Sequence, residues 1–181
     1  NHQFLNTDPL GDYEIKAELI QNKKSYKKTI TFTLLASEAP KLFTYEVINT
    51  YPHDITAYTQ GLEFDGDLLY ESTGLNGQST LRTIDYNSGK ILKNKPLDKS
   101  FFGEGLTIFK DQIIQLTWKS EKGLIYDKNT LTVKNSFPYE KSKEGWGLCN
   151  DGNKLYKSDG SQKIWKINPK DYSEEGHIEV M

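Results

Sequence analysis

Residues 58–74 read Tyr58-Thr59-Gln60-Gly61-Leu62-Glu63-Phe64-Asp65-Gly66-Asp67-Leu68-Leu69-Tyr70-Glu71-Ser72-Thr73-Gly74, and parts of this stretch return twice along the chain. Gln60-Gly61-Leu62 is followed by Glu104-Gly105-Leu106 and then by Trp146-Gly147-Leu148. The three glycines lie 44 and 42 residues apart. A period of roughly 40–50 residues is typical of a β-propeller, in which each repeat forms a blade of four short strands.

The repeats also share their strands and turns. Aligned on the glycines, the segment Leu68-Leu69-Tyr70-Glu71-Ser72 corresponds to residues 113–117 and 154–158. Later in each repeat an aspartate or asparagine follows an apolar segment and begins a turn, at Asp85, Asp127 and Asn168. Short apolar segments separated by Asp, Asn and Gly are typical of β-strands joined by tight turns. We therefore predict an all-β fold in which helix is nearly absent.

The number of repeats is smaller than a propeller needs. Residues 61–181 hold about three repeats, whereas propellers have roughly 4–8 blades. We expect either that this sequence is part of a larger protein or that something outside it completes the ring. The segment Phe43-Thr44-Tyr45-Glu46-Val47-Ile48-Asn49-Thr50-Tyr51 has a strand pattern, and we predict that it closes the ring by completing the last blade.

The first part of the chain has a different pattern. Alternating apolar residues in 12–20 (Tyr13, Ile15, Ala17, Leu19) and in 28–35 (Ile30, Phe32, Leu34) predict two half-buried antiparallel strands joined by the polar connector 21–25. Two strands alone are marginal in water. We therefore assign residues 1–38 to the last hairpin of an Ig-like β-sandwich whose earlier strands lie outside this chain, and residues 39–181 to a partial propeller.

Composition narrows the possible partners. The 181 residues carry a formal net charge of −2, and the Lys and Asp/Glu residues are interspersed, so a nucleic-acid partner is not expected. No apolar run approaches the ~20 residues needed to span a bilayer. The N-terminus Asn1-His2-Gln3 shows no signal-peptide pattern. If the natural protein is exported, its signal has been removed or lies upstream. Oligomeric state is left open.

Metal and thiol chemistry are not indicated. The chain has one cysteine and three histidines, and none of them is spaced as a pair of metal ligands would be. We therefore expect no zinc site and no cofactor. Cys149 stands between strand-like neighbours, which favours a small buried side chain over a reactive thiol.

The repeat alignment brings a set of polar and aromatic residues together. In a propeller the innermost strands line a central channel, and ligand sites form where strand ends and loops meet at its mouth. Residues directly before the repeat glycines, and residues at the ends of the second strands, should lie at the same rim. A one-residue error in register would turn alternate side chains to the other face. The residues predicted to form one aromatic pocket are Tyr58, Gln60, Glu71, Glu104, Trp118 and Trp146.

Six motifs in series resemble a known family. They are Tyr58-Thr59-Gln60-Gly61-Leu62, Tyr70-Glu71-Ser72-Thr73-Gly74, Phe102-Gly103-Glu104-Gly105, Gln115-Leu116-Thr117-Trp118, Glu144-Gly145-Trp146-Gly147-Leu148 and Ser158-Asp159-Gly160-Ser161. In this order and spacing, from about residue 45 to about residue 169, the chain resembles the glutaminyl-peptide cyclotransferases of the plant and bacterial type. The resemblance implies a five-bladed propeller that converts the N-terminal glutamine of a peptide or protein into pyroglutamate, releases ammonia and needs no metal.

The sequence departs from the family pattern at two places. Tyr58 stands where the family motif usually has phenylalanine, which adds a hydroxyl at the pocket edge. Family members also continue for further blades that carry an Asn-Glu-Leu-Glu stretch, an Asn-Gly motif and a late lysine, whereas this sequence stops at Met181. We therefore expect the 181 residues alone to be inactive or weakly active and the full-length natural protein to be a cyclase.

The reaction itself calls for one carboxylate. The α-amine must lose a proton as it attacks the side-chain amide, and the leaving nitrogen must gain one to depart as ammonia. We predict Glu71 as this proton shuttle, because only the first repeat has an acid at that position, where the others have Leu116 and Lys157.

The remaining pocket residues are given supporting roles. Trp118 and Trp146 are expected to form the aromatic wall, with an indole N–H free to bind the amide or the developing oxyanion. Gln60 and Glu104 are expected to bind the polar ends of the substrate.

Other interpretations stay open from the residues alone. Glu71 could be a solvated strand-end acid, and the tryptophans could pack between blades. The propeller could bind a peptide or glycan at the cell surface without catalysis. A calcium-dependent lactonase-type hydrolase is disfavoured, because several converging carboxylate and amide oxygens would be needed. A sandwich module before a propeller suggests an exported bacterial protein, located in the periplasm, at the cell surface or outside the cell.

Overall fold

The computed structural model describes residues 3–5 and 8–180, and all regular structure in these residues is β. The chain divides into two compact units, one built mainly from the residues up to Tyr45 and the other from Glu46–Ile178. Each unit is described by itself. Within the described residues there is no helix of the length and apolarity that a membrane crossing requires.

The first unit contains an antiparallel hairpin. Strand β1 (Gly11–Gln21) pairs with β2 (Lys24–Leu34) along its whole length. Asn22 and Lys23 form the turn, with φ values of 52° and 63°. Two successive residues with positive φ are the signature of a type I′ turn, whose twist matches that of the strands it joins. The two predicted strands and their connector are therefore present.

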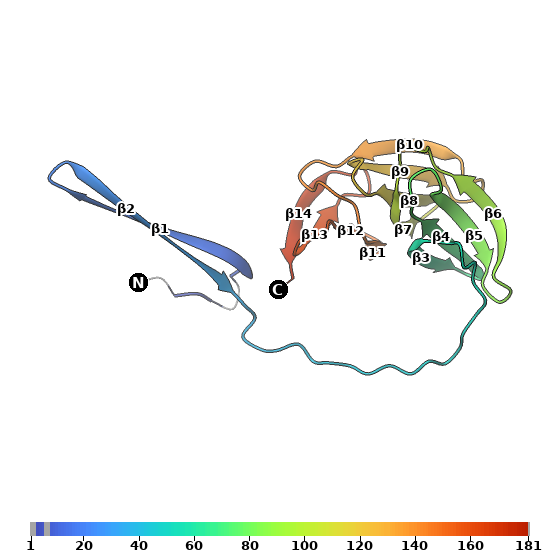
Figure 1. Cartoon of the computed structure of the whole chain (residues 1–181), viewed down its shortest axis with the longest axis horizontal. Helices are drawn as coiled ribbons and strands as arrows, with labels where there is room; N and C mark the ends of the chain where they lie inside the picture. The colour runs from blue at the N-terminus through green and yellow to red at the C-terminus, as the bar shows by residue number, and fades with distance from the viewer. Residues whose placement is uncertain (1–2, 6–7, 181) are drawn as a thin grey trace. The chain divides into compact units, whose positions relative to one another are not determined.

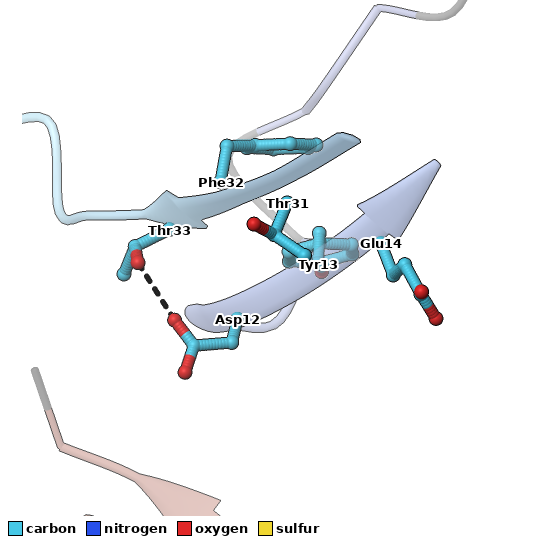
Figure 2. A pocket seen from close by; sticks show the side chains of 6 residues that line it. All are labelled: Asp12, Tyr13, Glu14, Thr31, Phe32 and Thr33. Carbon is cyan, nitrogen blue, oxygen red and sulfur yellow. Dashed lines mark hydrogen bonds between the residues drawn. The ribbon is translucent and has the colours of Figure 1, made fainter. Parts of the chain in front are cut away.

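Aromatic contacts hold the open end of this hairpin. Tyr13 pairs with Phe32 across the strands, and their rings stack with centroids 5.6 Å apart. Beside them the Thr33 hydroxyl donates a hydrogen bond of 2.6 Å to the Asp12 carboxylate (Figure 2). The shallow hollow shown in Figure 2 lies over these residues.

The apolar face of the hairpin is exposed, so the prediction of half-buried strands is wrong. Ile15 and Ile30 are cross-strand partners on the predicted face, yet 49% and 54% of their surfaces are accessible. Leu19 is 62% exposed. Burial needs a second layer, and the sheet formed by β1 and β2 has only these two strands in the described chain. The assignment of residues 1–38 to a β-sandwich stays a prediction.

The predicted closing strand is not formed. Residues 43–51 run without strand structure, and Phe43 and Tyr45 are 81% and 92% exposed. A strand requires a neighbouring edge for its backbone hydrogen bonds. None of the sheets in the described chain includes this segment, so its alternating pattern alone does not make it a strand.

Three four-stranded sheets make up the second unit. The first is β3 (Thr59–Asp65), β4 (Leu68–Thr73), β5 (Thr80–Asp85) and β6 (Lys90–Pro96). The second is β7 (Gly103–Phe109), β8 (Gln112–Thr117), β9 (Lys122–Asp127) and β10 (Val133–Pro138). The third is β11 (Leu148–Asn150), β12 (Leu155–Ser158), β13 (Lys163–Ile167) and β14 (Glu174–Glu179). In each sheet the strands pair in chain order, as the repeats predict.

The sheets are arranged as propeller blades. Figure 1 shows them side by side in an arc, with β3, β7 and β11 on its inner side and β6, β10 and β14 at its outer rim. The all-β propeller prediction is confirmed, with three blades in the described chain. A total of five blades stays a prediction.

The repeat glycines allow the inner strands to approach one another. A Cβ added to Gly61 would lie 2.8 Å from the backbone nitrogen of Leu106, and one added to Gly105 would lie 2.4 Å from the carbonyl oxygen of Trp146. The Gly105 N–H also donates a hydrogen bond of 2.7 Å to that same carbonyl. A larger side chain would push the strands apart. This close approach explains the glycine at the start of the first and second inner strands.

The hydrophobic core lies between the blades in two clusters. Successive side chains of β8 point to opposite faces of the second sheet, so Ile113 belongs to one cluster and Ile114 to the other. The cluster shared by the first and second sheets contains Tyr70, Leu81, Leu106, Ile113, Leu124, Tyr126 and Leu131. The cluster shared by the second and third sheets contains Phe109, Ile114, Leu116, Ile125, Phe137, Tyr139, Leu155, Trp165 and Ile167. Cys149 lies in β11 but is exposed, so the prediction that it is buried is wrong.

Candidate active site

A pocket of about 320 Å³ lies where the inner strands begin. It is lined by Tyr58, Gln60, Phe102, Glu104, Trp118 and Trp146. Five of these six are residues that the repeat alignment predicted to converge. The pocket is formed by segments from all three blades, because Gln60 begins β3, Glu104 begins β7 and Trp146 lies two residues before β11.

Bulges in two inner strands aim the polar side chains. The ladder between β3 and β4 shifts register between Thr59 and Gly61, at Gln60. The ladder between β7 and β8 shifts between Gly103 and Leu106, a stretch that includes Glu104 and Gly105. A bulge takes a residue out of the regular alternation and redirects its side chain, and such bulges recur beside active sites. Gln60 and Glu104 thereby reach the same pocket.

Aromatic rings form the wall beside them. The Phe102 ring contacts Tyr58 and Trp118 edge-on, with centroids 6.1 and 5.5 Å apart. The backbone N–H of Trp118 donates a hydrogen bond of 3.0 Å to the backbone carbonyl of Phe102, which fixes the two segments together. Phe102 was not among the predicted site residues. It occupies the same repeat position as Tyr58, three residues before the glycine, and this correspondence could have identified it.

Glu104 is the acid inside the pocket. Its side chain is nearly buried, with 9% of the residue accessible. Burial, followed by the negative charge of Glu144, raises the pKa of Glu104 to about 7. The Ser72 hydroxyl donates a hydrogen bond to the Glu104 carbonyl, which anchors its backbone to the first blade. Near neutral pH, this carboxyl can both accept and release a proton.

Both pocket tryptophans have their indole N–H groups occupied. Trp118 Nε1 and Trp146 Nε1 donate hydrogen bonds of 2.8 and 2.9 Å to the same oxygen, Oε2 of Glu144. Binding of the substrate amide or oxyanion by one of these N–H groups stays a prediction, and it would require that N–H to leave Glu144. Their expected place in the pocket wall agrees with the structure.

Glu71 lies outside this pocket. It is central in β4, fully buried, and its carboxylate oxygen Oε1 accepts hydrogen bonds from Thr59 at 2.6 Å and pairs with His53 at 2.9 Å. Arg82 Nη1 is 3.7 Å from the other carboxylate oxygen. The alternation of β4 explains the difference, because the adjacent Ser72 points toward Glu104 and Glu71 must point to the opposite face.

Two interpretations of Glu71 are thereby corrected. The alignment predicted that Glu71 would join the pocket, whereas the pocket lining does not include it and its buried carboxylate contacts Arg82 and the partly exposed His53. The alternative of a solvated strand-end acid is also wrong, because none of Glu71 is accessible. Its second carboxylate oxygen is buried without a hydrogen-bond partner.

The residues that the structure describes include no cluster of three or more His, Cys, Asp or Glu side chains arranged to hold a metal ion. Glu104 and Glu144 are charged groups of the site, and Lys119 and Asp159 lie near Glu144. Lys119 Nζ lies 3.9 Å from Glu144 Oε1 and 4.1 Å from the centroid of the Trp118 ring.

A family model described as glutamine cyclotransferase matches residues 17–181. The chain belongs to the glutamine cyclotransferase family. The resemblance read from the six motifs is confirmed, and the match extends further toward the N-terminus than those motifs, beginning inside β1.

Individual relatives agree with the family. A glutaminyl-peptide cyclotransferase of Arabidopsis thaliana is 40% identical over 125 residues, which cover 68% of this chain and 39% of that protein. The crystal structure of Myxococcus xanthus glutaminyl cyclase matches with a TM-score of 0.68 and 31% identity, over 75% of this chain and 56% of that one. The RRP9 WD40 repeats match with a TM-score of 0.55 at 13% identity, which shows the propeller fold alone. This chain thus spans well under two thirds of either cyclase relative.

Proposed function

We propose that the protein cyclises the N-terminal glutamine of peptides or proteins to pyroglutamate with release of ammonia, and that Glu104 carries the proton. Membership of the glutamine cyclotransferase family supports the reaction. The single observation that carries the assignment of Glu104 is its position, a nearly buried carboxyl in an aromatic pocket with a pKa raised to about 7.

The proposed proton path is a closed cycle. Ionised Glu104 takes one proton from the α-amine as the amine nitrogen bonds to the side-chain amide carbon. The same carboxyl then gives that proton to the amide nitrogen, the carbon–nitrogen bond breaks, and ammonia leaves. Glu104 ends ionised, as it began, so one group serves both steps. No metal enters these steps.

The pocket walls contribute by holding the substrate folded. The reaction is intramolecular, so much of the rate comes from keeping the amine against its own amide carbon. The rings of Tyr58, Phe102 and Trp118 form a wall that restricts the side chain and limits access of water, which would otherwise give glutamate. Gln60, beside them, offers an amide that can hydrogen-bond the substrate's polar groups.

The pKa values of enzyme and substrate define a working range. A terminal α-amine has an ordinary pKa of about 7.7–8.0. Glu104 is ionised above its pKa of about 7. The reactive combination, neutral amine with ionised carboxyl, is therefore well populated slightly above neutral pH.

Broader features of the whole protein remain predictions drawn from the sequence. These are a ring of five blades, an exported location and independence from metals. The relatives' greater length is consistent with blades beyond the three seen here.

The test is a cyclisation assay on the natural gene product that contains this sequence. A short peptide beginning with glutamine is incubated with the protein, and both ammonia and the loss of the free α-amine are followed. We expect the two to appear in equal amounts. A matched peptide beginning with asparagine controls for deamidation, because it cannot form the five-membered lactam by this route. Absence of turnover across many glutamine-initiated peptides, with peptide binding retained, would instead support a non-catalytic binding propeller.

A further inference from the structure

Glu144 occupies a pocket-wall position in the repeat. Three residues before the repeat glycine, the first blade has Tyr58 and the second has Phe102, both of which line the pocket. The third blade has Glu144 at this position. An acid stands where the repeat elsewhere places an aromatic ring.

The Glu144 carboxylate joins two walls of the pocket. Its Oε2 atom accepts the indole N–H of Trp118 at 2.8 Å and that of Trp146 at 2.9 Å. These tryptophans come from different blades, one after β8 and one before β11. A shared acceptor fixes the orientation of both rings at once, because each indole has a single N–H donor.

The backbone around Glu144 is fixed as well. The Gly145 N–H donates a hydrogen bond of 3.0 Å to the Trp118 carbonyl. A Cβ on Gly145 would lie 2.3 Å from the Tyr139 hydroxyl, so the residue following Glu144 has no room for a side chain. The backbone N–H of Trp146 donates a hydrogen bond of 3.0 Å to the backbone carbonyl of Ser158. The two residues that directly follow Glu144 are thus fixed in place by their backbone contacts.

We propose that Glu144 is a positioning residue for the cyclisation: its carboxylate holds the rings of Trp118 and Trp146 in place and sets a permanent negative charge beside Glu104. This inference rests on the proposed function. It assigns Glu144 no contact with the reacting atoms.

The surrounding charges support the electrostatic part. The charged and titratable groups that act electrostatically on Glu104 include Glu144, Glu104 in turn acts on Tyr139, and those that act on Glu144 are Lys119, 3.9 Å away, and Asp159. The two indole hydrogen bonds, from Trp146 and then Trp118, lower the pKa of Glu144, which therefore stays charged while Glu104 titrates. Two nearby carboxyls whose pKa values are pushed apart are a common arrangement for separate roles in one site.

Two substitutions separate the two parts of the role. Glu144→Gln keeps a carbonyl oxygen that can accept both indole N–H groups but removes the charge. We expect the pKa of Glu104 to fall, so the acid limb of kcat/KM moves to lower pH while KM stays close to wild type. Glu144→Ala removes acceptor and charge together. We expect a higher KM and a loss of kcat/KM of up to about 10²-fold, as for small misplacements of a reacting group.

The readouts include two that do not need activity. Carboxyl ¹³C NMR of the natural gene product should show Glu104 titrating at lower pH in Glu144→Gln than in wild type. Tryptophan fluorescence should change in Glu144→Ala and not in Glu144→Gln. Asp67→Asn, which removes an equal charge from the exposed β3–β4 turn, is the matched control and should change neither.

The outcomes distinguish this inference from the proposed function. A wild-type protein without cyclase activity contradicts the proposed function, while the NMR and fluorescence results still decide the arrangement around Glu144. Unchanged Glu104 titration in Glu144→Gln overturns the electrostatic part. Unchanged KM and fluorescence in a folded Glu144→Ala overturn the positioning part. Glu144→Asp keeps the negative charge, so its kcat/KM should fall at the same pH as that of the wild type. A folded Glu144→Asp protein whose kcat/KM instead fell at the lower pH of Glu144→Gln would count against the role of the charge.

Discussion

The Glu104 carboxyl lies in a pocket walled by Trp118 and Trp146, and the Glu144 carboxylate accepts the indole N–H groups of both tryptophans. Burial, with the charge of Glu144, raises the pKa of Glu104 to about 7. Hydrogen bonds from two indoles lower the pKa of Glu144. One carboxyl is thus suited to carry a proton near neutral pH, and the other to remain charged.

The pH profile follows from Glu104. Because the reaction needs a neutral amine and an ionised carboxyl, kcat/KM should fall as pH drops below the amine pKa of about 7.7–8.0, and more steeply as Glu104 is protonated through about 7. Steady-state kinetics across a pH series, with a glutamine-initiated peptide, measures this limb. A fall no steeper than protonation of the substrate amine alone produces, down to the ordinary glutamate pKa of about 4.3, would show that another group, or none, acts as base.

Glu71 should matter for stability and not for proton transfer. Glu71→Ala would leave Arg82 and the hydrogen-bond donors of Thr59 and His53 without this acceptor, and we expect a loss of about 3 kcal/mol in the free energy of unfolding. Glu71→Gln retains an acceptor oxygen and should cost less. Urea denaturation measures both.

The same Glu71→Gln variant decides between the two candidate acids. If the folded variant keeps its turnover, Glu71 acts only in the structure. A large drop in kcat with normal stability and KM would restore Glu71 as the proton shuttle, contrary to our assignment.

The close approach of the inner strands makes one glycine much less replaceable than another. In Gly105→Ala the new Cβ would meet the Trp146 carbonyl at 2.4 Å and the Leu148 nitrogen at 2.7 Å, so we expect a loss of about 1–3 kcal/mol. Gly147→Ala is the matched control from the same repeat position, where the nearest atom is the Ser158 hydroxyl at 3.1 Å. Thermal denaturation should show Gly105→Ala to be less stable than Gly147→Ala. Equal stabilities of the two variants would argue that close backbone packing is not the reason for the glycine at position 105.

A buried ion pair lies within the third blade, between β12 and β14. Lys157 is fully buried, lies 3.6 Å from Glu174 and has its ammonium 3.4 Å from the centroid of the Tyr139 ring. Lys157→Met keeps the volume but leaves the buried Glu174 charge without its cation, so we expect a loss of about 3–5 kcal/mol. Chemical denaturation gives the value, and Lys166→Met, a substitution of a partly accessible lysine, is the control.

The pH dependence of this pair has a definite sign. Burial lowers the pKa of Lys157 to about 8, below its ordinary 10.5. Between these values the unfolded chain binds more protons than the folded one, so the contribution of Lys157 to stability should grow as pH rises from about 8 to 10.5. A contribution that declined over this range in wild type relative to Lys157→Met would contradict the sign.

Much of the fold could be predicted because the repeat is local. Glycine spacing and short apolar segments specify the blades, and the close contact of Gly105 with Trp146 shows the physical reason. Features that depend on absent neighbours could not be predicted in the same way. Residues 43–51 have a strand pattern but no edge to pair with, and the hairpin face around Ile15 has no layer to cover it.

The site was predicted in position but not in every role. Repeat position correctly grouped Gln60, Glu104 and Trp146. It failed for Glu71 because successive side chains along a strand point to opposite faces. Ser72 in β4 points toward the second blade, so the adjacent Glu71 points away from it. Glu144 was not selected as a site residue, although its repeat position matches that of Tyr58. Its role depends on two indole hydrogen bonds that no sequence pattern reveals.

The most direct test of the central claim is the activity of Glu104→Gln in the natural gene product. The substitution keeps the size of the side chain and removes its ability to exchange a proton. We predict that kcat for a glutamine-initiated peptide falls by about 10²–10⁴-fold, the usual contribution of a general acid–base group, while the peptide still binds. A Glu104→Gln protein that cyclises the peptide at the wild-type rate would contradict the account.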